Sequence, residues 1–223
     1  LNELGGLHSL ADFENVKVQY VEPTYADLKD GSTLFELPPN GQGLTAIMMK
    51  KMMQFCNIDR FSAGSFERVH LEAEIAKIAY SARNNFIGDP NFSEVKQNVF
   101  LDDLYLERLS KEISLGKLLN HNLGDDFFTR NKDTVLICAA DNTGNAISLI
   151  FSTFHAFGSG LSSKKYGLLF HNRGAGFVLK KNHPNELLGG KRPLHTIIPA
   201  ILKEKNGSIM PFGVMGGQYQ ACG

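Results

Sequence analysis

The pair Asp133-Thr134 stands where a polar run of the chain gives way to an apolar one. A Thr that becomes the first residue of a chain carries its own base, because the free α-amine has a pKa near neutrality and lies beside the hydroxyl. Such a nucleophile needs a strand that holds it rigidly and a cleavable segment before it, and the sequence offers both. A β-branched Thr is also a common way to open a strand, so both interpretations stand on the residues alone.

Two glycine-rich runs, 157–160 and 213–217, are the next candidates for a chemical role. Neither has the Gly-Lys-Ser/Thr of a phosphate-binding loop or the three spaced glycines of a dinucleotide fingerprint. Tight turns would explain both runs, since glycine adopts positive φ at no steric cost. For Gly216 and Gly217 an oxyanion hole is the alternative, because consecutive glycines let two backbone N–H groups converge on one developing negative charge.

Metal and cofactor chemistry are not indicated by the sequence. The histidines of the second half, His155, His171, His183 and His195, lack the i, i+4 spacing of a helical zinc site. The three cysteines have neither metal-ligand spacing nor a disulfide framework. We therefore expect no metal and no cofactor.

The elements that must position these groups follow from the apolar pattern. After a polar linker over residues 120–133, strands are predicted at 134–140, 145–151, 166–170, 196–202 and 209–214, with turns at 142–145 and 205–207. Upstream, short strands are predicted over 16–20 and 25–37. Helices are predicted over 44–55, 65–86 and 101–119. Most helices precede a predominantly antiparallel meander of strands along the chain, and this order predicts α/β layers packed on each other.

Composition narrows the function classes. The 223 residues carry 23 Lys+Arg and 23 Asp+Glu, so no net field exists to hold nucleic acid or an anionic membrane. The longest apolar run, 135–140, is too short to span a bilayer. The chain begins at Leu1 without a signal peptide and ends at Gly223 behind a glycine run, so we expect a piece of a longer protein.

A series of short motifs follows one order along the chain. In the first half it consists of Gly5-Gly6, Asp12-Phe13, Pro38-Pro39, His70, Glu74, Lys77, Ala79, Arg83 and Gly88-Asp89-Pro90. In the second half it consists of Asp133-Thr134, Asp141, Gly144-Asn145-Ala146, Phe157-Gly158-Ser159-Gly160, Gly167-Leu168-Leu169, Asn172, Pro184-Asn185, Gly190-Lys191-Arg192-Pro193-Leu194, Pro199 and Gly216-Gly217. This series resembles the gamma-glutamyltransferase family over nearly the whole chain.

The resemblance implies a fold and a division of the chain. The fold would be the four-layer αββα sandwich of N-terminal nucleophile hydrolases, incomplete in this α/β chain. Residues 1–133 would be the end of a large-subunit-like region and 134–223 the start of a small-subunit-like catalytic region. Thr134 would be the nucleophile, freed by self-cleavage of the Asp133–Thr134 bond. Gly216 and Gly217 would stabilise the oxyanion, and Ser152 would hold the nucleophile.

The departures from the family concern substrate recognition. Thr134-Val135-Leu136 replaces the Thr-Thr-His of family members that act on glutathione. In the family, an acidic side chain binds the glutamyl amine, and Gly176 occupies that position here. Arg173 replaces the amide side chain that is usual nearby, and Phe154 replaces a family Asn. His195-Thr196 replaces a Ser-Ser pair that meets the substrate carboxylate. The resemblance thus implies Arg173, Asn172, His195 and Thr196 as the substrate-binding residues of an altered pocket.

The expected function is a self-processing, glutathione hydrolase-like enzyme that passes an acyl group through an acyl-Thr intermediate to water or an amine. One alternative is an acylase or amidase acting on non-glutamyl acyl amides, of the glutaryl- or cephalosporin-acylase type. A second is a family member that folds and binds but does not react. The expected partners are a small acyl amide and the other piece of the cleaved precursor, with no nucleic acid and no membrane. The cellular compartment is left open.

Overall fold

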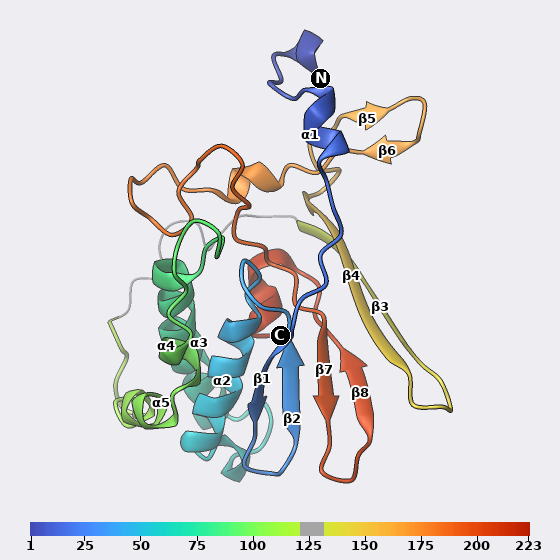
Figure 1. Ribbon diagram of the computed structural model, residues 1–223. Helices are drawn as coiled ribbons and strands as arrows, with labels where there is room; N and C mark the ends of the chain where they lie inside the picture. Colours follow the sequence, from blue (N-terminus) through green and yellow to red (C-terminus); the bar gives the residue numbers. More distant parts are fainter. Residues whose placement is uncertain (121–131) are drawn as a thin grey trace.

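A four-stranded antiparallel sheet joins the two halves of the chain. The computed structural model describes residues 1–120 and 132–223, and within them the sheet runs in the order β1-β2-β7-β8 (Figure 1). Its strands are β1 (Thr24–Asp27), β2 (Thr33–Glu36), β7 (Ala200–Lys203) and β8 (Ile209–Phe212). The predicted strands 196–202 and 209–214 are therefore shorter than expected. Pairing of β2 with β7, with Leu34 opposite Leu202, ties residues before 134 to residues after it.

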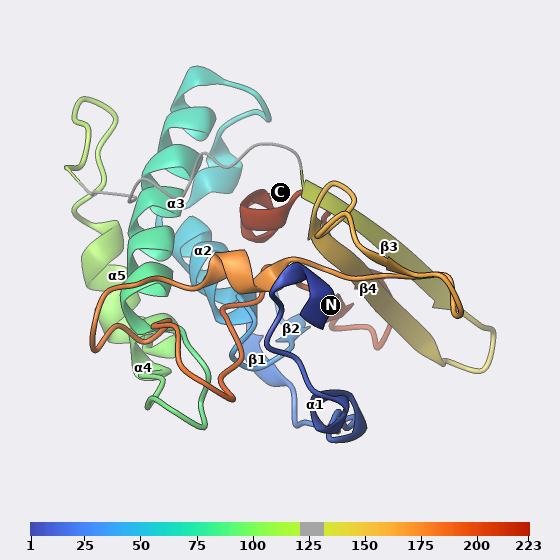
Figure 2. The same cartoon turned by 90° about the horizontal axis from the view of Figure 1, so that it is seen from above.

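Two helices cover one side of this sheet. Helix α2 (Gly43–Phe55) packs against β1 and β2 and against α3 (Phe66–Phe86), and Figure 2 shows both helices on the side away from the β3–β4 hairpin. The apolar residues that recur at helical spacing in α2 are fully buried: Leu44, Ile47, Met48 and Met52. Ser65 caps the start of α3, since its Oγ accepts from Arg68 N–H at 3.3 Å.

The single helix predicted over 101–119 is wrong. The chain forms α4 (Asn98–Leu101) and α5 (Asp103–Ser110), separated at Asp102. Asp102 has an extended backbone and its carboxylate accepts from Tyr105 N–H at 2.7 Å, so it caps a new helix and cannot continue the old one. Leu104 in α5 and Leu118 beyond it are 81% and 71% exposed.

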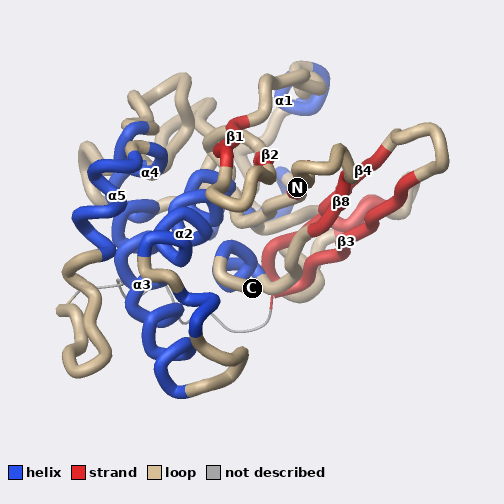
Figure 3. The backbone as a smooth tube through the Cα atoms, turned by 90° about the horizontal axis from the view of Figure 1, so that it is seen from below, coloured by secondary structure: helices blue, strands red, loops and turns tan. Residues whose placement is uncertain are grey.

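The remaining strands form two hairpins. β3 (Lys132–Ala140) pairs with β4 (Ala146–His155), and β5 (Ser162–Ser163) pairs with β6 (Leu168–Leu169). The β3–β4 hairpin contacts β8 and projects away from the helices (Figure 3). The strand predicted over 16–20 is absent, and Tyr20 is 99% exposed. The N-terminal segment carries α1 (Leu10–Glu14), and 3₁₀ turns occur at Asn2–Leu4, Ile58–Arg60, Arg173–Gly176 and Gly217–Ala221.

Candidate active site

Thr134 lies near the start of β3, where the ladder with β4 is interrupted. Thr134 is opposite Ser152, whereas Asp133 is opposite Phe154, so Thr153 is an extra residue and forms a β-bulge beside the 133–134 peptide bond. Phe154 has a φ of 78°, a left-handed conformation that is costly for a bulky residue. The local distortion therefore falls at the bond that the sequence marks as scissile.

Ser152 is the side chain that faces the candidate nucleophile. Its Oγ lies 3.3 Å from Thr134 Oγ1. The same oxygen accepts from Phe154 N–H at 3.1 Å and from Arg173 Nη2 at 2.9 Å. Two N–H donors from different elements thus fix the Ser152 hydroxyl beside Thr134.

Arg173 links this hydroxyl to the loop before β7. The side chain is buried, donates from Nη1 to Thr196 Oγ1 at 2.8 Å, and places its guanidinium carbon 4.5 Å from the centre of the Phe154 ring. Burial lowers the pKa of Arg173 to about 10. No carboxylate among the described residues lies within ion-pair distance of it. The side chains of Arg173 and Thr196, both predicted to bind substrate, are therefore hydrogen-bonded to each other.

Gly217, one of the two glycines of the predicted oxyanion hole, is linked to Thr134 through Gln220. Gly216 and Gly217 have φ values of 127° and 58°, conformations that favour glycine. The Gln220 amide has two carbonyl oxygens on one side, Val214 and Thr196 at 2.9 and 3.1 Å, which require its nitrogen there. Its oxygen then accepts from Gly217 N–H at 3.2 Å, on the side where the amide lies 3.3 Å from Thr134 Oγ1.

A buried amide and a buried guanidinium hold the glycine segment in place. Gln42 Nε2 donates to Thr196 O at 2.6 Å and to Gly217 O at 3.2 Å, and its Oε1 accepts from Arg83 at 2.8 Å. Gln42 is fully buried and Arg83 is 3% exposed. Sequence reasoning missed both roles, as it missed Gln220. The available signal was Arg83, an arginine on the apolar side of a helix.

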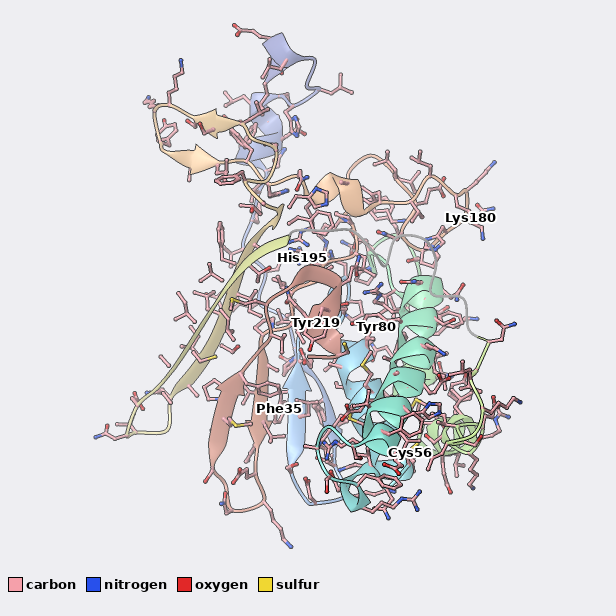
Figure 4. All side chains as sticks on the ribbon, turned by 180° about the vertical axis from the view of Figure 1, so that it is seen from behind. Phe35, Cys56, Tyr80, Lys180, His195 and Tyr219 are labelled. Carbon is pink, nitrogen blue, oxygen red and sulfur yellow. The ribbon has the colours of Figure 1, made fainter. Side chains whose placement is uncertain are left out.

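The side chains of two predicted substrate-binding residues, Asn172 and His195, have other partners than Thr134. Asn172 is held by His155, with its Oδ1 accepting from the His155 backbone N–H at 3.1 Å and its Nδ2 at 2.7 Å from His155 Nδ1. His195 donates its backbone N–H to Asn40 O at 2.9 Å, and Figure 4 shows it in the middle of the molecule. Burial, then Arg173 and His171, lower the pKa of His195 to about 3. Within the described residues, neither side chain hydrogen-bonds to Thr134.

Solvent reaches the candidate nucleophile from the face of the β3–β4 hairpin. A surface pocket of about 270 Å³ is lined by Thr134, Val135, Phe151, Ser152, Thr153, Phe157 and Leu169. Val135 is 54% exposed at its mouth. A small molecule can therefore approach Thr134 Oγ1 without a rearrangement of the sheet.

The described residues include no helix that is both long and apolar enough to span a bilayer. In the same ranges, no group of three or more His, Cys, Asp or Glu side chains could hold a metal ion. The predicted polar linker lies mostly at 121–131, outside the described residues.

The chain is similar to known proteins over nearly its whole length. The family model described as gamma-glutamyltranspeptidase matches residues 1–222. The chain is 30% identical over 220 residues to the glutathione hydrolase-like YwrD proenzyme of Bacillus subtilis, covering 99% of the chain and 41% of the relative. It is 31% identical over 217 residues to the oxamate amidohydrolase proenzyme of Klebsiella pneumoniae, covering 97% and 40%.

A solved structure is similar over the same range. The cephalosporin acylase from Bacillus halodurans superposes with a TM-score of 0.83 at 31% identity, covering 99% of this chain and 39% of that one. The chain thus spans about 40% of the length of the relatives it matches.

Proposed function

Because the chain belongs to the gamma-glutamyltranspeptidase family, we propose that it carries the catalytic centre of a self-processing acyl-transferring hydrolase with Thr134 as nucleophile. The observation that supports this most directly is the placement of Thr134 Oγ1. It lies 3.3 Å from Ser152 Oγ and 3.3 Å from the Gln220 amide, whose oxygen accepts from Gly217 N–H. Nucleophile, holding hydroxyl and candidate oxyanion donor therefore share one small cluster.

The predicted fold class is confirmed. The chain forms part of the α/β sandwich of N-terminal nucleophile hydrolases, with the helix layer α2–α3 on one sheet and the β3–β4 hairpin beyond it. In this arrangement Thr134 lies at the beginning of a strand, which fixes its backbone. A rigid nucleophile on a strand is what near-attack geometry requires.

The proposed maturation is an attack of Thr134 Oγ1 on the Asp133 carbonyl carbon. The C–O bond forms, the Asp133–Thr134 C–N bond breaks, and the Thr134 nitrogen takes the proton, so an ester joins the two residues. Water then cleaves the ester, which leaves an Asp133 carboxylate, a free Thr134 hydroxyl and a free α-amine. Residues 1–133 and 134–223 are the proposed pieces. They would remain together, because β2 and β7 pair across the division.

In the proposed turnover, the new α-amine of Thr134 accepts the hydroxyl proton while Oγ1 attacks the substrate's acyl carbon. Backbone N–H groups of Gly216 and Gly217 would bind the oxyanion, each worth about 3 kcal/mol. The Gln220 oxygen must then yield the Gly217 N–H to the substrate oxygen. The amine of the substrate leaves with the proton, and water or another amine releases the acyl group from Thr134.

Two substrate classes and an inert protein remain alternatives. A γ-glutamyl donor is one class. An acylase or amidase substrate is the other, and it is favoured by Gly176, which offers no carboxylate to a glutamyl amine. The relatives whose name is glutathione hydrolase, without the suffix -like, are 23–26% identical to the chain, below the 31% of the oxamate amidohydrolase. Arg173, Asn172, His195 and Thr196 remain the proposed substrate-binding residues.

Covalent capture tests the proposal. The protein is mixed with a panel of γ-glutamyl, glutaryl and other acyl anilides, stopped in acid, and weighed by mass spectrometry. We expect a gain of one acyl mass on the piece that begins at Thr134, and none in Thr134→Ala. Release of the aniline by Thr134→Ala at the parent's rate would overturn the assignment. The acyl groups that react decide between the two substrate classes, and no reaction with any donor would favour the inert protein.

A further inference from the structure

The side-chain amide of Gln220 lies between the candidate nucleophile and the candidate oxyanion hole. The side chain is fully buried, and its Nε2 donates to Val214 O and Thr196 O. The amide oxygen must therefore face the other way. There it accepts from Gly217 N–H at 3.2 Å and lies 3.3 Å from Thr134 Oγ1. One oxygen atom thus contacts both the proposed reacting hydroxyl and a donor of the hole.

The hydroxyl proton of Thr134 points to this amide oxygen. A second oxygen, Ser152 Oγ, also lies 3.3 Å from Thr134 Oγ1. However, Ser152 Oγ already accepts from Phe154 N–H at 3.1 Å and from Arg173 Nη2 at 2.9 Å, and a hydroxyl oxygen has two lone pairs. The amide oxygen of Gln220 has a lone pair left for the Thr134 proton and therefore accepts it.

Both hydrogen bonds of the Gln220 oxygen belong to the resting site and must be lost in the reaction. In the proposed turnover the Gly217 N–H binds the oxyanion, and the Thr134 proton moves to the new α-amine. An interaction that is made before the reaction and lost in the transition state slows the chemical step. The Gln220 oxygen thus occupies the place that the acyl oxygen of a substrate needs.

We propose that Gln220 is a further catalytic residue, whose amide oxygen fills the oxyanion hole until an acyl group enters. The acyl oxygen displaces the Gln220 oxygen from Gly217 N–H, and the Thr134 hydroxyl is released for attack at the same time. An acyl group that does not reach the hole leaves both bonds to Gln220 in place, so the residue selects acyl groups that enter fully. This inference rests on the proposed function of Thr134, but the contact with Gly217 can be tested without turnover.

Two substitutions remove the oxygen and keep apolar bulk at the same position, Gln220→Met and Gln220→Leu. Both also remove the Gln220 donor of Val214 O, so both should lower the melting temperature, and a melt shows which of them folds. Gln218→Met is the matched control. Gln218 is two residues away, and its amide oxygen accepts from Arg83, so the control loses a buried hydrogen bond without changing the contacts of Gly217 N–H.

Hydrogen exchange tests the contact itself. It is followed by mass spectrometry, with overlapping peptides that resolve residue 217, in Thr134→Ala protein, which can neither cleave itself nor turn over. We expect Gly217 N–H to exchange about threefold or more faster when Gln220→Met or Gln220→Leu is added, and to stay within about twofold when Gln218→Met is added. Unchanged exchange in the amides of α3 shows that the fold persists. Equal exchange of Gly217 with and without Gln220 would overturn the proposal.

Kinetics in protein that retains Thr134 test the catalytic role. The value of kcat/KM for release of 4-nitroaniline from γ-glutamyl and glutaryl 4-nitroanilides reports the acylation step. With the donor that the parent uses, Gln220→Met and Gln220→Leu should raise kcat/KM about threefold or more, and Gln218→Met should not raise it. A purely structural role would lower kcat/KM together with the melting temperature.

A kcat/KM that falls or stays equal in the folded Gln220 variants would therefore overturn the proposal. No release of 4-nitroaniline by the parent would instead count against the proposed function of Thr134. The exchange of Gly217 would still decide whether Gln220 fills the hole, because that measurement needs no reaction.

Discussion

Replacing Gln42 with leucine tests whether the buried amide organises the candidate site. Leucine has a similar size but no polar atoms, so Gly217 O would lose its Gln42 donor at 3.2 Å and Arg83 would lose its Gln42 acceptor at 2.8 Å. Gly217 O keeps the i→i+3 bond of the 3₁₀ turn that it opens, so its lost bond to Gln42 costs about 0.5–1.5 kcal/mol. A lost bond to a charged group costs about 1.5–3 kcal/mol. Thr196 O keeps Gln220 as a donor. The expected loss of unfolding free energy is thus about 2–4.5 kcal/mol.

Urea unfolding followed by circular dichroism measures that loss. Gln97→Leu is the matched control, since Gln97 is exposed and its side chain has no hydrogen bond among those of the described residues; it should stay within about 0.5 kcal/mol of the parent. A Gln42→Leu protein within about 1 kcal/mol of the parent would refute the reasoning. So would a large loss in both variants, because the effect would then not come from the buried hydrogen bonds.

Three further substitutions test the electrostatics of the fold. Burial without a hydrogen-bonding partner raises the pKa of Glu36 well above its usual value. The parent therefore loses stability as the pH rises above the usual glutamate pKa of about 4.3, whereas Glu36→Gln, which cannot ionise, should not lose it; a difference in urea unfolding that stays constant with pH would contradict this. The pKa of His195 is shifted in the opposite direction, to about 3, so the free energy of unfolding falls as the pH drops below 6.5. His195→Gln should reduce that fall, measured as the melting temperature at each pH. Asp89 is 1% exposed and accepts three hydrogen bonds from Arg192. Asp89→Asn should therefore lower the free energy of unfolding by about 3 kcal/mol, whereas Glu107→Gln, in an exposed ion pair, should leave it unchanged. Equal effects of the two substitutions would count against a role for the buried pair.

Local patterns in the sequence predicted α2, α3 and the strand that carries Thr134. The apolar face of α2 and the Ser65 cap depend on residues three or four apart, which a sequence displays directly. The family resemblance implied that Ser152 holds the nucleophile; the ladder places Ser152 opposite Thr134, and the role itself stays a prediction. Asp102 shows the limit of this reasoning, because one residue in an otherwise helical pattern divided the helix.

Contacts between distant segments were not predictable. Gln42 and Thr196 are 154 residues apart, and nothing in the composition around Gln42 indicates a partner. The bulge at Thr153 and the positive φ of Phe154 likewise depend on how β4 meets the following segment. Arg173 was expected to face the substrate, yet the side chain also donates to Ser152 and Thr196. Periodicity carries no information of this kind, since it reports only which face of an element is buried.

Thr134 Oγ1 is proposed to cleave the bond before it and then to act as the nucleophile. Intact-mass spectrometry of freshly purified protein, repeated after incubation, tests both roles in the parent, Thr134→Ser and Thr134→Ala. We expect cleavage between Asp133 and Thr134 in the parent, slower cleavage at the same bond in Thr134→Ser, and a single uncut chain in Thr134→Ala. A parent that stays uncut under all conditions, or a Thr134→Ala protein that is cut at the same bond, would contradict it.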